Sequence, residues 1–208
     1  MDHQPRSRIR AKKGQRDRLI AIAQQHPDWV LGFADETWWS RFAQPQAHAW
    51  VEETEGPLRL IEQEVPKHDP DPQALACYGV LLRQVGQVER VWLRFVDGRP
   101  VSAITEQFLA WSCTRLQEVG VRVWVLIWDN ASWHVSKRVR AWIRAHNRRV
   151  KQQGHGVRIV SCYLPVKSPW LNPIEPKWVH GKRAIVEPAR LLSAQEVADR
   201  VCLPWLSP

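Results

Sequence analysis

Residues 121–130 read VRVWVLIWDN, a nearly unbroken run of β-branched and aromatic residues that ends abruptly at Asp129 and Asn130. A strand that is apolar on both sides of its pleat has to be covered on both faces, as central parallel strands are. Helical spacing of apolar residues predicts one helix before this run, at residues 105–119, and another after it, at residues 133–151. Residues 157–164 then predict the next strand.

Further strands are predicted on the N-terminal side of this unit. They are residues 29–34, 37–42, 75–83 and 88–96. The first is expected to end at Asp35, and the last two should pair as a hairpin across a turn that contains Gly86. Together these patterns predict an α/β fold, a mixed sheet with helices on its faces.

The chain divides into three parts by charge and pattern. They are a basic arm at residues 1–28 with a short helix near 17–25, the mixed-sheet domain at residues 29–190, and a C-terminal helix and tail at residues 191–208. Ser193 followed by Glu196 is a capping-box pattern and predicts the start of the last helix.

Composition narrows the class of partner. Thirty Lys and Arg against 21 Asp and Glu give a net charge of +9, which favours a polyanion such as nucleic acid. No apolar run approaches the roughly 18 residues that span a bilayer, and the first residues have no apolar core of a secretory signal. We therefore expect a cytoplasmic protein without a membrane partner. The four cysteines are scattered and predict reduced thiols, and most of the 13 tryptophans are expected in the core.

Three acidic residues stand at the ends of predicted elements, and each has an ordinary structural explanation. Asp35 can end a strand at solvent, and Asp129 can cap the following helix. In the sequence Asn172-Pro173-Ile174-Glu175, Asn172 can be the N-cap and Glu175 the third helical residue that reaches back to it.

A shared site explains all three acids at once. The carboxyl ends of neighbouring parallel strands meet at one edge of a sheet, which would bring Asp35 and Asp129 together, with Glu175 at a nearby helix start. Carboxylate oxygens suit Mg²⁺ or Mn²⁺. Two such ions roughly 3.5 to 4 Å apart can activate an attacking oxygen and stabilise a leaving oxygen at a phosphodiester. The sequence therefore predicts a site for two divalent ions.

Basic residues recur along one face of the helix predicted at residues 133–151. They are Lys137, Arg140, Arg144, Arg148 and Lys151. Beside a metal site this face is predicted to hold DNA phosphates. For an isolated helix the same pattern would be a solvated charge stripe.

Three blocks carry a resemblance to a known family. LGFADETWW (31–39), VLIWDNASWH (125–134) and LPVKSPWLNPIEPKW (164–178) resemble the catalytic blocks of the mariner-like DDE transposases, in particular their bacterial insertion-sequence branch. The resemblance covers residues 29–180 and implies an RNase H-like fold that cleaves and transfers DNA strands at transposon ends with Mg²⁺. It assigns metal binding and catalysis to Asp35, Asp129 and Glu175. Residues that match the blocks and shape the site are Asn130, His134, Asn172 and Pro173.

The chain departs from the family pattern in two ways. Residues 130–174, 45 in number, separate Asp129 from Glu175, which is more than the family usually has. We interpret the extra length near residues 146–157 as an insertion formed by a longer helix and a turn. Members normally carry paired helix-turn-helix domains ahead of the catalytic domain, and residues 1–28 are too short to hold them. A catalytic half, from a split or truncated reading frame, is therefore expected.

The resemblance also implies partners. They are double-stranded DNA of the transposon ends and target, a second copy of the chain, and a separately encoded helix-turn-helix polypeptide. The expected location is the bacterial cytoplasm, at the nucleoid.

One alternative function is that of a catalytically inactive DNA-binding remnant that lacks its recognition domains. Another is an RNase H-like nuclease for RNA–DNA hybrids or Holliday junctions, against which the Asn-Pro-Ile-Glu block argues.

Overall fold

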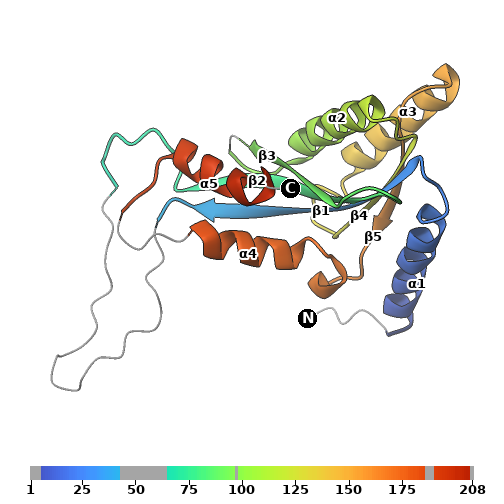
Figure 1. Cartoon of the computed structure of the whole chain (residues 1–208), viewed down its shortest axis with the longest axis horizontal. Coiled ribbons are helices and arrows are strands. Elements are labelled where there is room, and N and C mark those ends of the chain that lie inside the picture. Colours follow the sequence, from blue (N-terminus) through green and yellow to red (C-terminus); the bar gives the residue numbers. More distant parts are fainter. Residues whose placement is uncertain (1–5, 43–64, 97, 186–189, 207–208) are drawn as a thin grey trace.

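The computed structural model describes residues 6–42, 65–96, 98–185 and 190–206 of the chain (Figure 1). Its elements are α1 (Arg6–Ala23), β1 (Trp29–Ser40), β2 (Ala74–Arg83), β3 (Arg90–Val96), α2 (Ser102–Glu118), β4 (Val123–Trp128), α3 (Lys137–Gln153), β5 (Arg158–Tyr163), the 3-10 helix η2 (Pro169–Leu171), α4 (Glu175–Ile185) and α5 (Ala194–Leu206). Most elements lie within a few residues of the predicted ranges, because apolar periodicity is a local property of the sequence.

The strands form one mixed sheet in the order β3-β2-β1-β4-β5. β1, β4 and β5 are parallel to one another, whereas β2 and β3 continue from β1 as an antiparallel meander. Helices α2 and α3 cover one face of this sheet, and α4 lies on the other face beneath β1 (Figure 1). The predicted α/β fold with a mixed sheet is confirmed.

β4 is the buried centre that its sequence predicts. Side chains alternate across the sheet, so that Trp124, Leu126 and Trp128 join the core under α2 and α3, and Val125 and Ile127 join the core on the opposite face. All five are at most 1% exposed. Two packed faces therefore hold rigid the strand that ends next to Asp129.

β1 differs from the prediction. It is a single strand of 12 residues, and Asp35 lies inside it rather than at its end. Parallel pairing with β4 stops at Phe33, opposite Ile127, while antiparallel pairing with β2 continues to Ser40. A neighbouring strand thus supplies backbone partners that carry β1 past its polar residues, and the division into strands at residues 29–34 and 37–42 is wrong.

The ends of the helices show where local sequence patterns were sufficient to predict the start or end of a helix. α1 begins at Arg6 and is longer than the short helix predicted near residues 17–25. The capping box of α5 is present: the backbone N–H of Ser193 donates to Glu196 at 2.8 Å, and the Glu196 N–H donates to the Ser193 hydroxyl at 3.1 Å. α3 is capped by Ser136 and ends at Gly154, whose φ of 73° favours glycine.

The composition leads us to expect reduced cysteines and no membrane-spanning segment. The four cysteines of the chain are free thiols. Within the described ranges, no helix combines the length and the apolar character that crossing a membrane requires.

Candidate active site

Asp35 lies where β1 stops pairing with β4 and continues beside β2. Its Oδ2 accepts a hydrogen bond of 2.9 Å from the indole Nε1 of Trp178 in α4. The residue opposite Asp35 on β2 is Gly79, where a Cβ atom would lie 2.1 Å from the Trp178 ring. The missing side chain of Gly79 therefore makes the slot for this ring. Asp35 is tied to the helix that begins with Glu175.

Asp129 follows the last residue of β4 and accepts hydrogen bonds through its Oδ1 atom. The backbone N–H of Ala131 donates at 2.9 Å, and Nδ1 of His134 lies at 2.7 Å. The other ring nitrogen of His134, Nε2, lies 2.8 Å from the Glu36 carboxylate. Stacking on Trp128, with ring centroids 4.4 Å apart, holds the imidazole in place. A chain of contacts through the buried ring of His134 therefore joins β1 to the end of β4.

Glu175 begins α4, but the segment before it does not form the capping arrangement that its sequence suggests. The side-chain amide of Asn172 donates at 3.1 Å to the backbone oxygen of Ala34 in β1. Its Oδ1 is buried and has no hydrogen-bond partner within the described part of the chain. The interpretation of Asn172 as a side-chain cap is therefore wrong, because this side chain attaches the helix start to β1 instead.

Burial raises the pKa of Asp35 to about 7, and repulsion from Glu175 and Glu36 contributes to the rise. Burial also raises the pKa of Glu175, with a further contribution from the charge of Asp129. Asp35 is thus affected by Glu175, and Glu175 by Asp129. The three predicted acids share one electrostatic neighbourhood.

The pKa of Asp129 moves in the opposite direction. Partial burial opposes its ionisation, but hydrogen bonds from His134 and Ala131 outweigh this effect and lower the pKa. Burial alone would lower the pKa of His134, whereas its bonds to Asp129 and Glu36 raise it to about 9. At neutral pH His134 is therefore a cation between two carboxylates.

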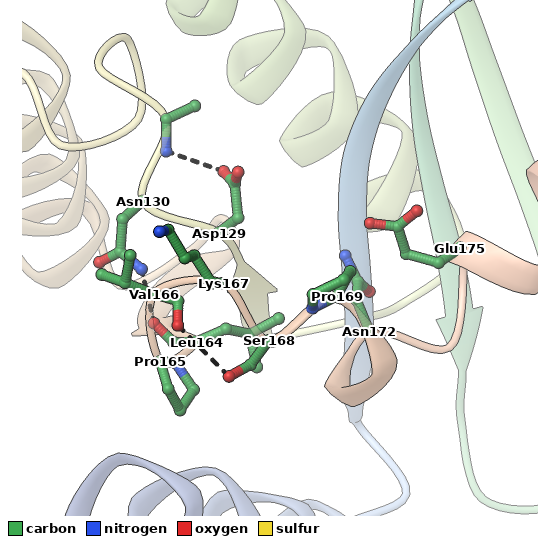
Figure 2. Close-up of a pocket in the computed structure, with 11 residues that line it drawn as sticks. Asp129, Asn130, Leu164, Pro165, Val166, Lys167, Ser168, Pro169, Asn172 and Glu175 are labelled. Atoms are coloured by element: carbon green, nitrogen blue, oxygen red, sulfur yellow. Dashed lines mark hydrogen bonds between the residues drawn. The ribbon is translucent and has the colours of Figure 1, made fainter. Parts of the chain in front are cut away.

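A pocket of about 240 Å³ opens beside Asp129 and Glu175 (Figure 2). Its wall is completed by Asn130 and by the loop after β5, which includes Lys167. Lys167 has a backbone φ of 56°, a value that residues other than glycine rarely adopt. Asp35 is not among the lining residues. The pocket therefore presents two of the three acids together with an exposed lysine.

Helix α1 holds the loops of this pocket through hydrogen bonds from two of its basic side chains. Lys12 Nζ donates to Asn130 Oδ1 at 3.1 Å and to the backbone oxygen of Leu164 at 3.2 Å, and Asn130 donates to the same oxygen at 2.6 Å. Arg16 donates to the backbone oxygen of Leu171 at 2.9 Å. Lys12 and Arg16 of the predicted basic arm thus hold the loops of the pocket in place. Asn130 links Lys12 to the loop after β5.

The remaining predicted residues are more widely placed. Pro173 lines a different pocket, between α1 and β1. The five basic residues of α3 are all exposed. Because a helix rises by about 1.5 Å per residue, Lys151 lies about 21 Å along α3 from Lys137, so only the start of the row is close to the acids. Figure 1 shows the far end of α3 projecting beyond the sheet.

The donor set suits a hard divalent cation, since it consists of carboxylate oxygens that repel one another. Among the described residues, no three Asp, Glu, His or Cys side chains already form a cluster that could hold a metal ion. Glu175 therefore affects the ionisation of Asp35, and Asp129 that of Glu175, although the three acids are not assembled into a closed cage.

Two residues that hold these acids, Glu36 and Trp178, are not among the site residues predicted from the sequence. Successive strand residues point to opposite faces, so Glu36 had to face away from Asp35, toward the next layer of the fold. Trp178 stands three residues after Glu175, a spacing that places both on one face of a helix. Both signals are present in the sequence. Lys12 has no such signal, because its partner Asn130 is 118 positions away.

Comparison with known proteins gives the class. A family model described as DDE superfamily endonuclease matches residues 87–197, just over half of the chain, including Asp129 and Glu175 but not Asp35. The chain belongs to this family. A search among curated proteins finds no match.

Solved structures of the Mos1 transposase are similar in fold. A paired-end complex with the left transposon end matches with a TM-score of 0.65 and 14% identity, over 100% of this chain and 57% of that chain. A mariner paired-end complex with Mn gives 0.64 and 14%, over 100% and 57%. The Mos1 catalytic domain gives 0.55 and 14%, over 100% and 85%. The chain spans just over half the length of the first two proteins. Its fold is the RNase H-like fold of a mariner transposase catalytic domain, as predicted.

Proposed function

We propose that this chain is the catalytic domain of a DNA transposase, which cleaves DNA strands at transposon ends and transfers them to a target. The observation that carries the proposal is the shared electrostatic neighbourhood of Asp35, Asp129 and Glu175, the last two of which line one pocket, in a member of the DDE endonuclease family. A structure of similar fold is a Mos1 transposase complex with a transposon end. The bacterial insertion-sequence branch belongs to the same proposal.

Asp35, Asp129 and Glu175 would hold two divalent ions, Mg²⁺ or Mn²⁺, which supply a polarised attacking oxygen and stabilise the leaving oxygen. A bound cation would relieve the repulsion by which Glu175 raises the pKa of Asp35 and Asp129 raises the pKa of Glu175, which favours this donor set. Structures of similar fold include Mos1 complexes with Mn and with Mg.

The chain's own residues would prepare the site for the cations and for an anionic substrate. Asp129 is ionised at neutral pH because its hydrogen bonds lower its pKa. Lys167 places an exposed ammonium group at the pocket, where a phosphate of the DNA backbone could bind. The basic row of α3 would hold the backbone further along the duplex, beginning at Lys137.

Two partners belong to this proposal. Because two transposon ends must be joined, the family resemblance leads us to expect a second copy of the chain in the active complex. Recognition of the terminal repeats is assigned to a helix-turn-helix polypeptide that acts with this chain.

The test is cleavage of a plasmid that carries the DNA flanking the reading frame, with the helix-turn-helix polypeptide supplied. The wild-type chain should give nicked or cut product with Mg²⁺ or Mn²⁺ and none with a chelator. Asp129→Ala should give no product, whereas Glu118→Gln, which changes an exposed acid on α2, should cleave normally. Undiminished cleavage by a folded Asp129→Ala variant would refute the assignment.

A second candidate function is DNA binding without cleavage. The exposed basic row of α3 favours it, because these residues can bind phosphates independently of the acids. This candidate predicts salt-dependent binding that is indifferent to sequence, with no metal-dependent product. Any product that requires the metal and is lost in Asp129→Ala would remove it.

A further inference from the structure

Asp35 and Asp129 are held in a similar way by different parts of the fold. In each, one carboxylate oxygen lies in hydrogen-bond contact with a ring nitrogen of a buried side chain. For Asp35 the ring is Trp178 of α4, and for Asp129 it is His134, in the turn before α3. The two rings approach from opposite faces of the sheet. Trp178 belongs to the core on one face, and His134 stacks on Trp128, which belongs to the core on the other face.

The Trp178 ring is fixed by its surroundings. It is 4% exposed and packs edge-on against Trp39, with ring centroids 5.9 Å apart. The slot at Gly79 has no room for a side chain, since a Cβ atom there would lie 2.1 and 2.5 Å from two ring atoms and 3.1 Å from Ile174. The ring therefore cannot turn without disturbing the core, and its N–H stays directed at Asp35.

The His134 ring is fixed by Glu36. Their side chains are 1% and 4% exposed, and the nitrogen–oxygen distance is 2.8 Å. The other oxygen of Glu36 accepts a hydrogen bond of 3.2 Å from the indole of Trp133. The Tyr163 hydroxyl donates to the backbone oxygen of His134 at 3.2 Å. Both oxygens of Glu36 are thus occupied by ring N–H groups, which suits an anchor and not a metal ligand.

We propose that Asp35 and Asp129 are each fixed through one oxygen so that the other oxygen of each is presented to the divalent ions. Trp178 is the positioning residue for Asp35. Glu36 is the positioning residue for Asp129 and acts through His134. The proposal rests on the proposed function, since it concerns the same acids. Groups that orient the ligands of a metal are worth about 10- to 100-fold in metal affinity.

The experiment measures Mn²⁺ binding to the full chain, from the loss of the free-ion EPR signal on titration. Trp178→Phe keeps a ring in the slot and removes the N–H, and Glu36→Gln keeps the size of the side chain and removes its charge. Each should weaken Mn²⁺ binding about 10- to 100-fold. The matched controls are Trp142→Phe, on the outer helix α3, and Glu106→Gln, whose partner is the exposed Arg138. Both controls should bind Mn²⁺ as the wild type does.

Double-mutant cycles separate positioning from general damage. If Trp178 acts through Asp35, Trp178→Phe should change Mn²⁺ affinity by less than about twofold when Asp35→Asn is already present. Glu36→Gln should likewise have little effect in the Asp129→Asn background. If either substitution lowers the Mn²⁺ affinity equally in the wild type and in the corresponding Asn variant, its role is merely structural and the proposal is overturned.

Gly79→Ala offers a second route to the same slot without changing the indole. A folded Gly79→Ala variant should lose at least as much affinity as Trp178→Phe, because the whole ring is displaced. If both Trp178→Phe and Glu36→Gln bind Mn²⁺ with the affinity of the wild type, the positioning roles are overturned but the metal site itself is not contradicted. Failure of the wild-type chain to bind Mn²⁺ contradicts the proposed function itself.

Discussion

Asp35 and Asp129 are the same kind of residue in one electrostatic neighbourhood, yet their surroundings move their pKa values in opposite directions. Asp35 lies inside a long strand, and burial with neighbouring acids raises its pKa to about 7. Asp129 lies past the end of a strand with its side chain 53% exposed, and its hydrogen bonds lower its pKa. Near neutral pH Asp35 is therefore divided between its protonated and ionised forms, whereas Asp129 is an anion. Backbone position and hydrogen-bond donors, and not residue type, decide the charge of each.

The largest expected effect comes from removing either acid. Asp35→Asn and Asp129→Asn should each reduce the cleavage rate by at least about 10³-fold, since bound ions supply several kcal/mol of transition-state stabilisation. Initial rates with Mg²⁺ measure this loss. If only one substitution abolished cleavage, the two acids would not be equivalent members of one metal site.

The next effect concerns how each acid is held. His134→Ala leaves Glu36 buried without its charged partner and should lower the free energy of unfolding by about 3 kcal/mol. Trp178→Phe removes one hydrogen bond and should cost about 1 kcal/mol. Urea denaturation measures both values. Adding Glu36→Gln to His134→Ala should restore part of the lost stability, and no recovery would show that the buried charge is not the cause.

The pH dependence of stability should separate the acids by sign. Asp35 has an ordinary pKa of 3.8 and a folded pKa of about 7, so the folded state retains a proton that the unfolded chain releases. The metal-free protein should therefore lose stability from Asp35 as the pH rises from about 4 to about 7. Asp129 contributes stability above its ordinary pKa of 3.8, and this contribution is lost as the pH falls through the lowered value.

Urea unfolding with a chelator, between pH 3 and pH 8, measures both contributions. Asp35→Asn should reduce the loss of stability between about pH 4 and about pH 7, and Asp129→Asn should reduce the loss on the acid side. Part of the loss on the neutral side should remain, because the pKa values of Glu175 and His134 are also raised. Identical pH profiles for Asp35→Asn and the wild type would contradict the raised pKa of Asp35.

The smallest effect is expected from the charges around the site. Lys137→Gln, at the end of α3 that is nearer to Asp129, should weaken DNA binding about equally for all sequences and reduce the salt slope by about 1. Lys151→Gln, at the far end, should change affinity less if the duplex is centred on the acids. Binding measured over a range of salt concentrations compares the two. A larger effect at Lys151 would place the DNA elsewhere on the helix.

Several elements could be predicted because their causes lie close together in the sequence. The apolar run of β4 and the capping box of Ser193 and Glu196 involve neighbouring residues, and both are present as predicted. The division of β1 into two strands is wrong because the polar pair Asp35 and Glu36 does not end the first one: pairing with β2 carries the backbone through it. The hydrogen bond of Asn172 could not be predicted for a similar reason, since its side-chain amide donates to a strand residue 138 positions away.

By itself, the sequence determined the order of the core elements and the three blocks that contain Asp35, Asp129 and Glu175. These depend on periodicity and on residues adjacent along the chain, which physical chemistry can interpret locally. Only the tertiary structure decided how each acid is held and how its pKa shifts. Trp178 reaches Asp35 across 143 positions, and His134 reaches Glu36 across 98. Burial and hydrogen bonds at such separations exist only once the sheet and its two covering layers have formed.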